Sequence, residues 1–297
     1  MTLEKTSPCK VNLLLNVLGR RADGFHELET VMHPVRVFDQ LRLTRGGNGI
    51  QLTCSEPALP TDSRNLVFRA AELFLNAAQA NEGVRLHLEK RIPLAAGLGG
   101  GSGNAATTLM GLNELFGQPL APEQLAALAV SLGSDVPFFL QSQPALAIGR
   151  GEQIKPVGAF AALRGAAFLL AHPGFGVATA WAYQQLARFP SALHGQRGRA
   201  ARLIELLQNA RLERAAPEFY NSLEAPVLHK YPLLVLFQDF LREHGATVTL
   251  MSGSGSTIFA VLARAAAAED VAEEFRAKYG AGTWVAVAPV KLDGDPG

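Results

Sequence analysis

A run of closely spaced glycines near residue 100 has the composition of a phosphate-binding loop. It lies between a short alternating strand at 86–88 and a helical pattern at 102–116. Glycine lets the backbone approach a ligand closely and adopt positive φ, and a helix start offers unpaired N–H groups at the positive end of its dipole. We therefore expect a polyphosphate to bind at this helix start. The run consists of Pro93, Leu94, Ala95, Ala96, Gly97, Leu98, Gly99, Gly100, Gly101, Ser102 and Gly103.

The same glycine run could also belong to a Walker P-loop, to a dinucleotide-binding loop or to a hinge that binds no ligand. A Walker P-loop needs a Gly-Lys pair, and the chain contains none. The segment 101–106 fits the G-x-G-x-x-A pattern of dinucleotide-binding proteins, with Glu123 about 20 residues further on. The continuous strand–helix–strand pattern of that fold is missing on both sides of the run. A glycine-rich hinge without a ligand is the third interpretation.

Four further motifs occur along the chain. They are Pro8-Cys9-Lys10-Val11-Asn12-Leu13, Asp23-Gly24-Phe25-His26-Glu27-Leu28, Gly133-Ser134-Asp135-Val136-Pro137-Phe138-Phe139 and Ser252-Gly253-Ser254-Gly255-Ser256-Thr257. In this order, and together with the glycine run, they resemble the GHMP small-molecule kinases over nearly the whole length. Within that superfamily, the motifs around Lys10 and His26 resemble members that phosphorylate the 2-hydroxyl of a cytidine diphosphate derivative of methylerythritol in non-mevalonate isoprenoid synthesis.

The resemblance implies an α+β, two-domain GHMP kinase fold. Its N-terminal half is ribosomal-protein-S5-domain-2-like, and its C-terminal half is ferredoxin-like. We expect an ATP-binding domain over 1–160 and a second domain over 161–297 that contributes to the substrate site. The residue pattern after about 160 agrees, because a strand, a group of helices, two strands, a helix and a last strand predict a four-stranded antiparallel sheet backed by helices.

Phosphoryl transfer needs in-line positioning, neutralisation of phosphate charge and a group near the attacking hydroxyl. The resemblance implies that Asp135 accepts the hydroxyl proton, and that Lys10 stabilises the γ-phosphoryl charge and keeps Asp135 ionised. Taken alone, Asp135 could be a helix N-cap and Lys10 a solvated lysine beside an edge strand. ATP with Mg²⁺ is the expected donor, without an assigned protein ligand for the metal.

The resemblance also assigns residues that bind the two substrates. Phe25 and Tyr183 would stack on the cytosine and His26 would hydrogen-bond its edge, although either aromatic ring could instead belong to the core. Asn65 and Lys90 fall where adenine and ribose are contacted, but helix capping and surface solvation compete with these roles. The expected substrate-binding residues are Asn12, Phe25, His26, Thr179 and Tyr183, and Asn65 and Lys90 join the glycine run as ATP-binding residues.

Periodicity predicts the elements that carry these residues. Alternating apolar residues predict strands through the first 60 or so positions, and Ser63 is the expected N-cap of the helix that follows. Gly117 and Gly133 are expected to end helices. The predicted helices are 66–77, 102–116, 122–132, 179–187, 199–208, 233–243 and 266–279, and the later strands are 166–171, two that flank 253–256, and 283–290.

Composition limits the kinds of partner. The 297 residues include 27 Lys and Arg against 26 Asp and Glu, a net charge of +1, which argues against nucleic acid. The two cysteines, Cys9 and Cys54, exclude a disulfide framework and suit a reducing compartment. The stretch 245–263 has no charged residue, but the glycines in its middle predict a strand–turn–strand rather than a membrane helix. We expect a cytoplasmic monomer or homodimer that binds small molecules and no membrane.

Three alternative functions remain open from the sequence. The chain could be another GHMP enzyme, such as a homoserine or mevalonate kinase. It could be a nucleotide-binding or RNA-binding module without catalysis, or a dinucleotide-dependent oxidoreductase.

Overall fold

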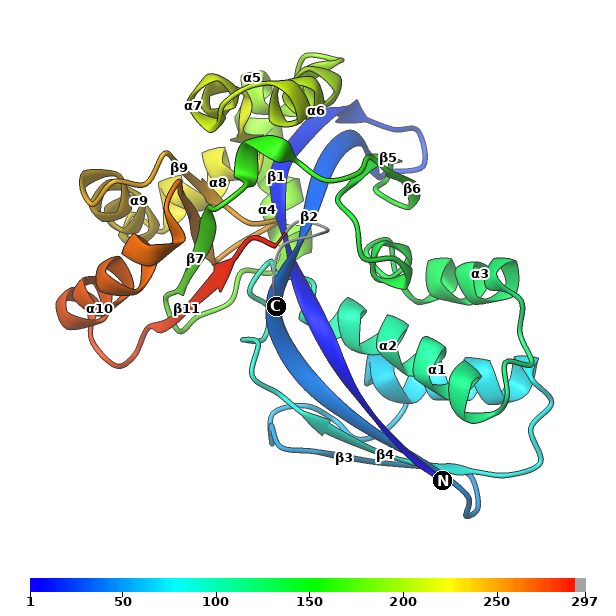
Figure 1. The fold of residues 1–297 in the computed structure, drawn as a ribbon. Helices are drawn as coiled ribbons and strands as arrows, with labels where there is room; N and C mark the ends of the chain where they lie inside the picture. Colours follow the sequence, from blue (N-terminus) through cyan, green and yellow to red (C-terminus); the bar gives the residue numbers. More distant parts are fainter. Residues whose placement is uncertain (292–297) are drawn as a thin grey trace. The chain divides into compact units, whose positions relative to one another are not determined.

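The protein, described by a computed structural model over residues 1–291, divides into two compact units whose segments alternate along the chain (Figure 1). Two long strands, β1 (Thr2–Arg20) and β2 (His26–Arg45), contribute one part to each unit. A single boundary at 160 does not describe this alternation, and the division there stays a prediction. Unit 1 comprises Met1–Cys9, Val37–Ile92 and Gly99–Ser142, and unit 2 comprises Lys10–Arg36, Pro93–Leu98 and the chain from Gln143 on.

Unit 1 is a small sheet covered by helices. The strand β4 (Val84–Glu89) pairs antiparallel with the end of β2 and parallel with β3 (Ile50–Cys54). Helices α1 and α2 pack side by side (Figure 1). Helix α2 is buried on most of its circumference, which fits a central helix rather than an amphipathic surface helix. The helical segments of this unit are α1 (Leu66–Ala77), α2 (Gly100–Leu115), α3 (Pro122–Leu132) and a 3₁₀ turn at Pro137–Leu140.

The N-cap of α1 and the start of α2 differ from the sequence prediction. The N-cap of α1 is Asn65 rather than Ser63, and its Oδ1 accepts a hydrogen bond from the N–H of Val67 at 2.9 Å. Helix α2 begins at Gly100, two positions before the expected 102, because Gly99 has φ of 67° and turns the chain into the helix. The predicted glycine after the same helix is confirmed, since Gly117 has φ of 81°.

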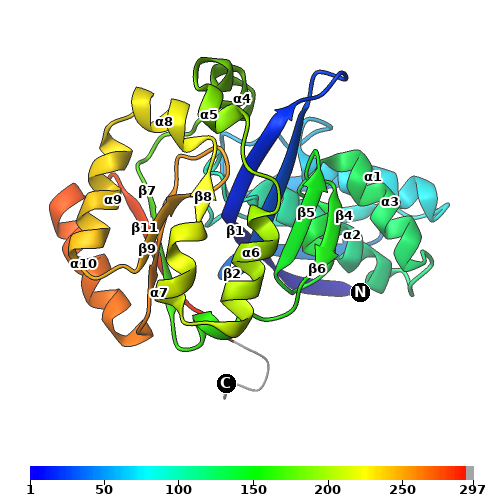
Figure 2. The same ribbon diagram turned by 90° about the horizontal axis from the view of Figure 1, so that it is seen from above.

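Unit 2 contains the predicted four-stranded antiparallel sheet. Its order is β11-β7-β10-β9, and α9 and α10 pack against it (Figure 2). Edge-to-face contacts of Phe237 and Phe240 with Phe275 join the two helices. The strands are β7 (Ala167–His172), β9 (Val248–Met251), β10 (Ile258–Leu262) and β11 (Trp284–Pro289), and the two helices are α9 (Leu233–Glu243) and α10 (Ala268–Tyr279).

The remaining elements of unit 2 are mostly short. Those that periodicity missed depend on pairing with distant strands or have only one or two turns. Among residues 1–291, no helix is long and apolar enough to cross a bilayer. The elements are β5 (Ala145–Gly149), β6 (Gln153–Pro156), α4 (Thr179–Gln185), α5 (Pro190–Leu193), α6 (Arg199–Asn209), α7 (Leu212–Ala215), β8 (Tyr220–Asn221), α8 (Glu224–Lys230) and 3₁₀ turns at Ala161–Leu163, Leu186–Arg188, Ala216–Glu218 and Ala265–Ala267.

A buried carboxylate in unit 1 fixes the chain that leads into the glycine run. Asp39 is fully buried, and its Oδ1 accepts the N–H groups of Arg91 and Ile92 at 2.7 and 2.9 Å. Its Oδ2 pairs with the ammonium of Lys90 and accepts the amide of Asn104 at 2.9 Å. One side chain of β2 therefore holds both the segment after β4 and the first turns of α2.

Replacement of Asp39 by alanine would remove the carboxylate partner of the buried Lys90 ammonium, whose other acceptor is Asn104 Oδ1 at 3.2 Å, and the acceptor of two backbone N–H groups. We expect Asp39→Ala to lower the free energy of unfolding by about 3–5 kcal/mol. Urea denaturation measures it, with Asp62→Ala as the matched control, because the Asp62–Arg64 ion pair lies on the surface. Equal stability of the two variants would contradict this account of Asp39.

Candidate active site

The first turn of α2 presents backbone donors, as the glycine run predicted. Gly99 precedes the helix in the left-handed region and provides no side-chain cap. In a helix that starts at Gly100, the first N–H groups have no intrahelical acceptor, because the first ladder bond runs from Gly103 N–H to Gly99 C=O, at 2.9 Å. These amides and the helix dipole form the kind of site that binds phosphate.

The glycines of the run differ in how closely the protein surrounds them. A Cβ on Gly97, which has φ of 77°, would lie 2.0 Å from the carbonyl oxygen of Ser252, and one on Gly103 would lie 2.5 Å from that of Pro8. These two positions are glycine because the backbone packs closely there. A Cβ on Gly101 would meet only Leu66, at 3.6 Å, so this position has room within the protein. Packing within the protein therefore does not require glycine at 101.

The first part of the run, 93–98, belongs to unit 2 and is held by backbone hydrogen bonds. The N–H of Lys10 donates to the carbonyl of Leu98 at 3.0 Å, and the N–H of Thr257 donates to that of Ala96 at 3.2 Å. Ala95 adopts φ of 50°, which is uncommon for a residue with a Cβ. The run is thus tied to β1 and to the 252–257 motif.

Lys10 is the centre of a buried polar cluster in unit 2. Its side chain is 2% exposed, and its Nζ donates to Asn12 Oδ1 at 2.5 Å and to the carbonyl of Gly97 at 2.8 Å. Lys10 and Asn12 lie two apart on β1 and share a face of the strand. The amide of Asn12 donates to Thr30 Oγ1 at 2.8 Å, which turns its oxygen toward Lys10. The solvated-lysine alternative is therefore wrong.

The 252–257 motif reaches the same cluster. Ser252 Oγ donates to the carbonyl of Gly97 at 3.0 Å, so that oxygen accepts from both Ser252 and Lys10. A Cβ on Gly253 would lie 3.2 Å from Lys10 Nζ and 3.4 Å from Asn12 Oδ1, which shows how closely the loop approaches. Three of the sequence motifs thus meet at one point of unit 2.

Asp135 lies in unit 1, in the turn between α3 and the 3₁₀ segment that begins at Pro137. The N–H of Val136 donates to the carbonyl of Gly133 at 3.1 Å and closes this turn. Asp135 is half-buried, and the residue in the N-cap position of the 3₁₀ segment is Val136. The helix-cap alternative for Asp135 is therefore wrong, and its pairing with Lys10 stays a prediction.

Two of the expected cytosine-binding residues meet in unit 2. The rings of His26 and Tyr183 stack with centroids 5.1 Å apart and an interplanar angle of 29°. Burial, helped by the positive charge of Arg20, lowers the pKa of His26, so its imidazole is neutral at pH 7. A neutral ring offers one donor and one acceptor to a base edge. Tyr183 also packs on the core of unit 2, so both interpretations of this residue have support.

Phe25 and Thr179 lie in the same unit. Phe25 is 55% exposed, which excludes the core interpretation, and the guanidinium of Arg150 lies 4.8 Å from its ring centroid. An exposed ring beside a cation can stack on a planar base. The hydroxyl of Thr179 is 2.8 Å from that of Ser254, so Thr179 is linked to the 252–257 motif.

The side chains of Asn65 and Lys90 have structural partners in unit 1. Asn65 caps α1 and also donates to the carbonyl of Pro60 at 2.8 Å. Lys90 is buried in the ion pair with Asp39, so the surface-solvation alternative is wrong. A role of either residue toward adenine or ribose stays a prediction. Residues 1–291 contain no group of three or more His, Cys, Asp or Glu that could hold a metal ion.

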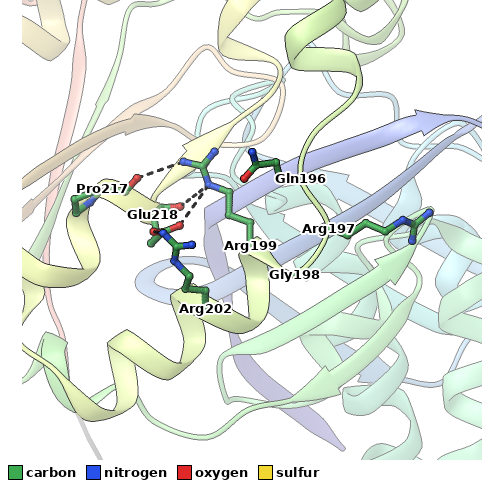
Figure 3. Close-up of a pocket in the computed structure, with 7 residues that line it drawn as sticks. All are labelled: Gln196, Arg197, Gly198, Arg199, Arg202, Pro217 and Glu218. Atoms are coloured by element: carbon green, nitrogen blue, oxygen red, sulfur yellow. Dashed lines mark hydrogen bonds and ion pairs between the residues drawn. The ribbon is translucent and has the colours of Figure 1, made fainter.

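A basic pocket of about 280 Å³ lies at the start of α6 and contains none of the expected site residues (Figure 3). Its acidic member, Glu218, pairs with Arg202 at 2.7 Å. Arg199 donates to the carbonyls of Glu218 and Pro217 at 3.2 and 3.3 Å and stacks on Tyr220 at 4.2 Å. These guanidinium groups have partners within the protein. Through these contacts, Arg199 and Arg202 anchor the chain just before β8.

A half-buried glutamate lies shortly after β8, and no role for it is predicted from the sequence. Glu224 Oε1 accepts the N–H of Met251 at 2.8 Å and the amide of Gln238 at 2.6 Å. Burial raises the pKa of Glu224 to about 7 from its ordinary value near 4.5, although both hydrogen bonds and the charge of Arg242 oppose the shift. No local pattern shows that Glu224 contacts Met251, because the two residues are 27 positions apart.

The raised pKa of Glu224 predicts a stability change with pH. The folded protein favours the protonated carboxyl, so this stabilisation is complete below about pH 4.5 and is lost as the pH rises through about 7. We expect the unfolding free energy of the wild type, relative to Glu224→Gln, to fall by about 1–2 kcal/mol between pH 5.5 and 8. Urea unfolding of both proteins at each pH measures this difference, and a constant difference would contradict the shift.

Comparison with known proteins defines the class. The family model "GHMP kinases N terminal domain" matches residues 65–143, and "GHMP kinases C terminal" matches residues 197–281. Solved structures of a homoserine kinase from Cytophaga hutchinsonii and of a mevalonate kinase from L. major cover 99% and 98% of this chain, which covers 96% and 97% of theirs, with TM-scores of 0.76 and 0.74. At 19% and 16% identity, these two likenesses concern the fold alone. The fold and the motifs define a GHMP kinase.

More similar proteins share one name. The 4-diphosphocytidyl-2-C-methyl-D-erythritol kinase of Synechococcus sp. (strain JA-3-3Ab) is 42% identical over 88% of this chain and 86% of its own length. That of Syntrophotalea carbinolica is 39% identical over 92% and 94%. A crystal structure of a 4-(cytidine 5′-diphospho)-2C-methyl-D-erythritol kinase is 36% identical, with a TM-score of 0.80 over 97% of this chain and 100% of its own. The chain belongs to the 4-diphosphocytidyl-2-C-methyl-D-erythritol kinase family.

Proposed function

We propose that this protein transfers the γ-phosphoryl group of ATP to the 2-hydroxyl of 4-diphosphocytidyl-2-C-methyl-D-erythritol, in the non-mevalonate pathway of isoprenoid synthesis. The observation that carries this proposal is the buried cluster in which Lys10 donates to Asn12 and to the carbonyl of Gly97. An ammonium beside a glycine-rich phosphate loop is the arrangement that phosphoryl transfer needs. The names shared by the family members support the choice of acceptor.

The triphosphate of ATP would bind at the start of α2. Hydrogen bonds from several amides to a charged phosphate contribute roughly 1.5–3 kcal/mol each, against about 0.3–1 kcal/mol from the dipole at an exposed site. Converging N–H groups therefore account for most of the affinity. We assign the segment 93–103 to this site, with Asn65 and Lys90 near the nucleoside.

Asp135 and Lys10 would perform the chemistry. Asp135 accepts the proton of the acceptor hydroxyl as the bond to phosphorus forms, and Lys10 stabilises the negative charge on the transferred group. Asn12, whose amide is held by Thr30, orients the acceptor next to Lys10. A positioned base of this kind contributes about 10²–10⁴-fold to the rate.

The cytidine moiety would bind to the aromatic residues of unit 2. The exposed ring of Phe25 supplies a stacking surface, and the neutral imidazole of His26, stacked on Tyr183, supplies hydrogen bonds to the base edge. Thr179 completes the substrate-binding set through its link to Ser254.

Mg²⁺ would accompany ATP and neutralise charge on the phosphates. In kinases this ion is held by phosphate oxygens, water and one or two protein groups.

The assignment of roles follows the division expected from the sequence. We propose that 1–160 binds ATP, that 161–297 contributes to the substrate site, and that the protein acts in the cytoplasm as a monomer or homodimer. The two family models fall on opposite sides of residue 160, which supports this boundary.

A panel of acceptors tests the proposed activity directly. We expect ATP-dependent phosphorylation of 4-diphosphocytidyl-2-C-methyl-D-erythritol, and no comparable turnover with homoserine or mevalonate, because neither carries a base for the aromatic residues. Product formation followed by mass spectrometry measures this preference. Higher kcat/KM for homoserine or mevalonate would assign the chain to another GHMP activity, and no turnover with any acceptor would favour a non-catalytic module.

Removal of the proposed base tests the mechanism. Asp135→Asn keeps the size of the side chain but cannot take the proton, so we expect kcat to fall by about 10²–10⁴-fold while ATP binding is retained. Steady-state kinetics and calorimetric titration with a non-hydrolysable ATP analogue measure the two quantities. Full activity of this variant would remove Asp135 from the mechanism.

A side chain at Gly101 tests where the triphosphate binds. Since a Cβ there has room within the protein, we expect Gly101→Val to fold normally and to weaken ATP binding by about 10-fold or more through contact with the phosphates. Gly282→Val is the matched control, because that exposed glycine also has open space around it. Calorimetry measures both affinities, and unchanged affinity at 101 would place the triphosphate elsewhere.

A further inference from the structure

We propose that Asn221 and Glu224 are positioning residues that hold the loop at 251–253 against the Lys10–Asn12 pair. This inference rests on the proposed function, because Lys10 is the group whose position it explains. Neither residue is expected to touch a substrate. Both of them, the loop and the Lys10–Asn12 pair lie within unit 2.

Asn221 holds the loop by its carbonyl groups. It is 2% exposed, and its Nδ2 donates to the carbonyls of Met251 and Gly253, both at 2.7 Å. Its Oδ1 accepts the N–H of Leu223 at 2.9 Å, which fixes the orientation of the amide. Both donors and the acceptor of this buried side chain are therefore used, and two of the three bonds go to the loop.

Glu224 holds the same loop by a backbone donor. Its Oε1 accepts the N–H of Met251, and the amide of Gln238 on α9 donates to the same oxygen. Met251 is thus bound on its N–H by Glu224 and on its carbonyl by Asn221. Because Met251 is the last residue of β9, the two side chains set the direction in which the chain enters the loop.

The segment that carries these residues is also fixed to the strand of Lys10. The N–H of Ser222 donates to the carbonyl of Leu15 at 2.8 Å, and Ser222 Oγ accepts the N–H of Val17 at 3.0 Å. The ring of Tyr220, in the same segment, lies 4.2 Å from the guanidinium carbon of Arg199. The segment therefore joins β1 to the loop at 251–253 through buried hydrogen bonds.

The loop has little freedom to move without disturbing Lys10. A Cβ on Gly253 would already be 3.2 Å from Lys10 Nζ, and Ser252 shares the carbonyl of Gly97 with that ammonium. A displacement of about 1 Å in a phosphoryl-transfer site can lower the rate by about 100-fold. Loss of the Asn221 bonds should therefore reduce catalysis through Lys10.

The first experiment reverses the hydrogen-bonding character of Asn221. In Asn221→Asp, a carboxylate of the same shape faces the two carbonyl oxygens. We expect kcat to fall by about 10–100-fold, with the KM for ATP changed by less than about 3-fold. Asn209→Asp is the matched control, because Asn209 is exposed on α6, and its kcat should stay within about 2-fold of the wild type.

A second readout does not depend on the substrate. Lys10 is buried, so amine acetylation followed by mass spectrometry should label it slowly in the wild type. We expect several-fold faster labelling of Lys10 in Asn221→Asp and unchanged labelling of the exposed Lys155. If the wild type phosphorylates no cytidylyl acceptor but this labelling change is seen, the proposed function fails and the positioning role stands.

A pair of variants at Glu224 separates positioning from folding. Glu224→Gln keeps an oxygen that can accept from Met251 and Gln238, whereas Glu224→Ala removes it. We expect kcat per folded molecule to fall by about 10-fold in Glu224→Ala and to be restored in Glu224→Gln. If Asn221→Asp does not fold, this pair of Glu224 variants still tests the positioning role. Folded Glu224→Ala with wild-type kcat and wild-type labelling of Lys10 would overturn the proposal.

Discussion

The structure of unit 2 depends on the burial of one ammonium group. Taking the charge of Lys10 out of water is costly unless oxygen atoms surround it. Two of the oxygens come from Asn12 and from the carbonyl of Gly97, and each must be held in place by other groups. Thr30 holds the amide of Asn12, and Ser252 shares the Gly97 carbonyl. Segments that are distant in the sequence therefore meet around Lys10, because its buried ammonium has to be surrounded by their oxygen atoms.

The two parts of the glycine run have different structural roles. Around Gly97, the backbone must pass so close to Ser252 that a side chain cannot fit, which brings its carbonyl to Lys10. Past Gly99, the chain becomes a helix whose first amides are open to a ligand. One short segment thus supplies an acceptor to the buried lysine and, past Gly99, the first amides of a helix.

Buried polar residues outside the motifs give the site its support. Asp39 joins the chain before the run to α2, and Asn221 joins the strand of Lys10 to the loop at 251–253. Such networks are stable only when every member is satisfied, so each acts as a unit rather than as separate bonds. The proposed catalytic groups are consequently positioned by residues that need not contact a substrate.

The sequence by itself determined the longer helices and the antiparallel sheet of unit 2, because periodicity is a local property. Its glycine content, which is also local, predicts a phosphate-binding loop. The family motifs, which are also local, identified Lys10 and Asn12. Only the tertiary structure decided that Gly97 is a packing glycine while Gly101 has room, and that Asn221 holds the loop at 251–253. The groups that decide these roles lie far away in the sequence, and no local pattern records a contact that folding alone creates.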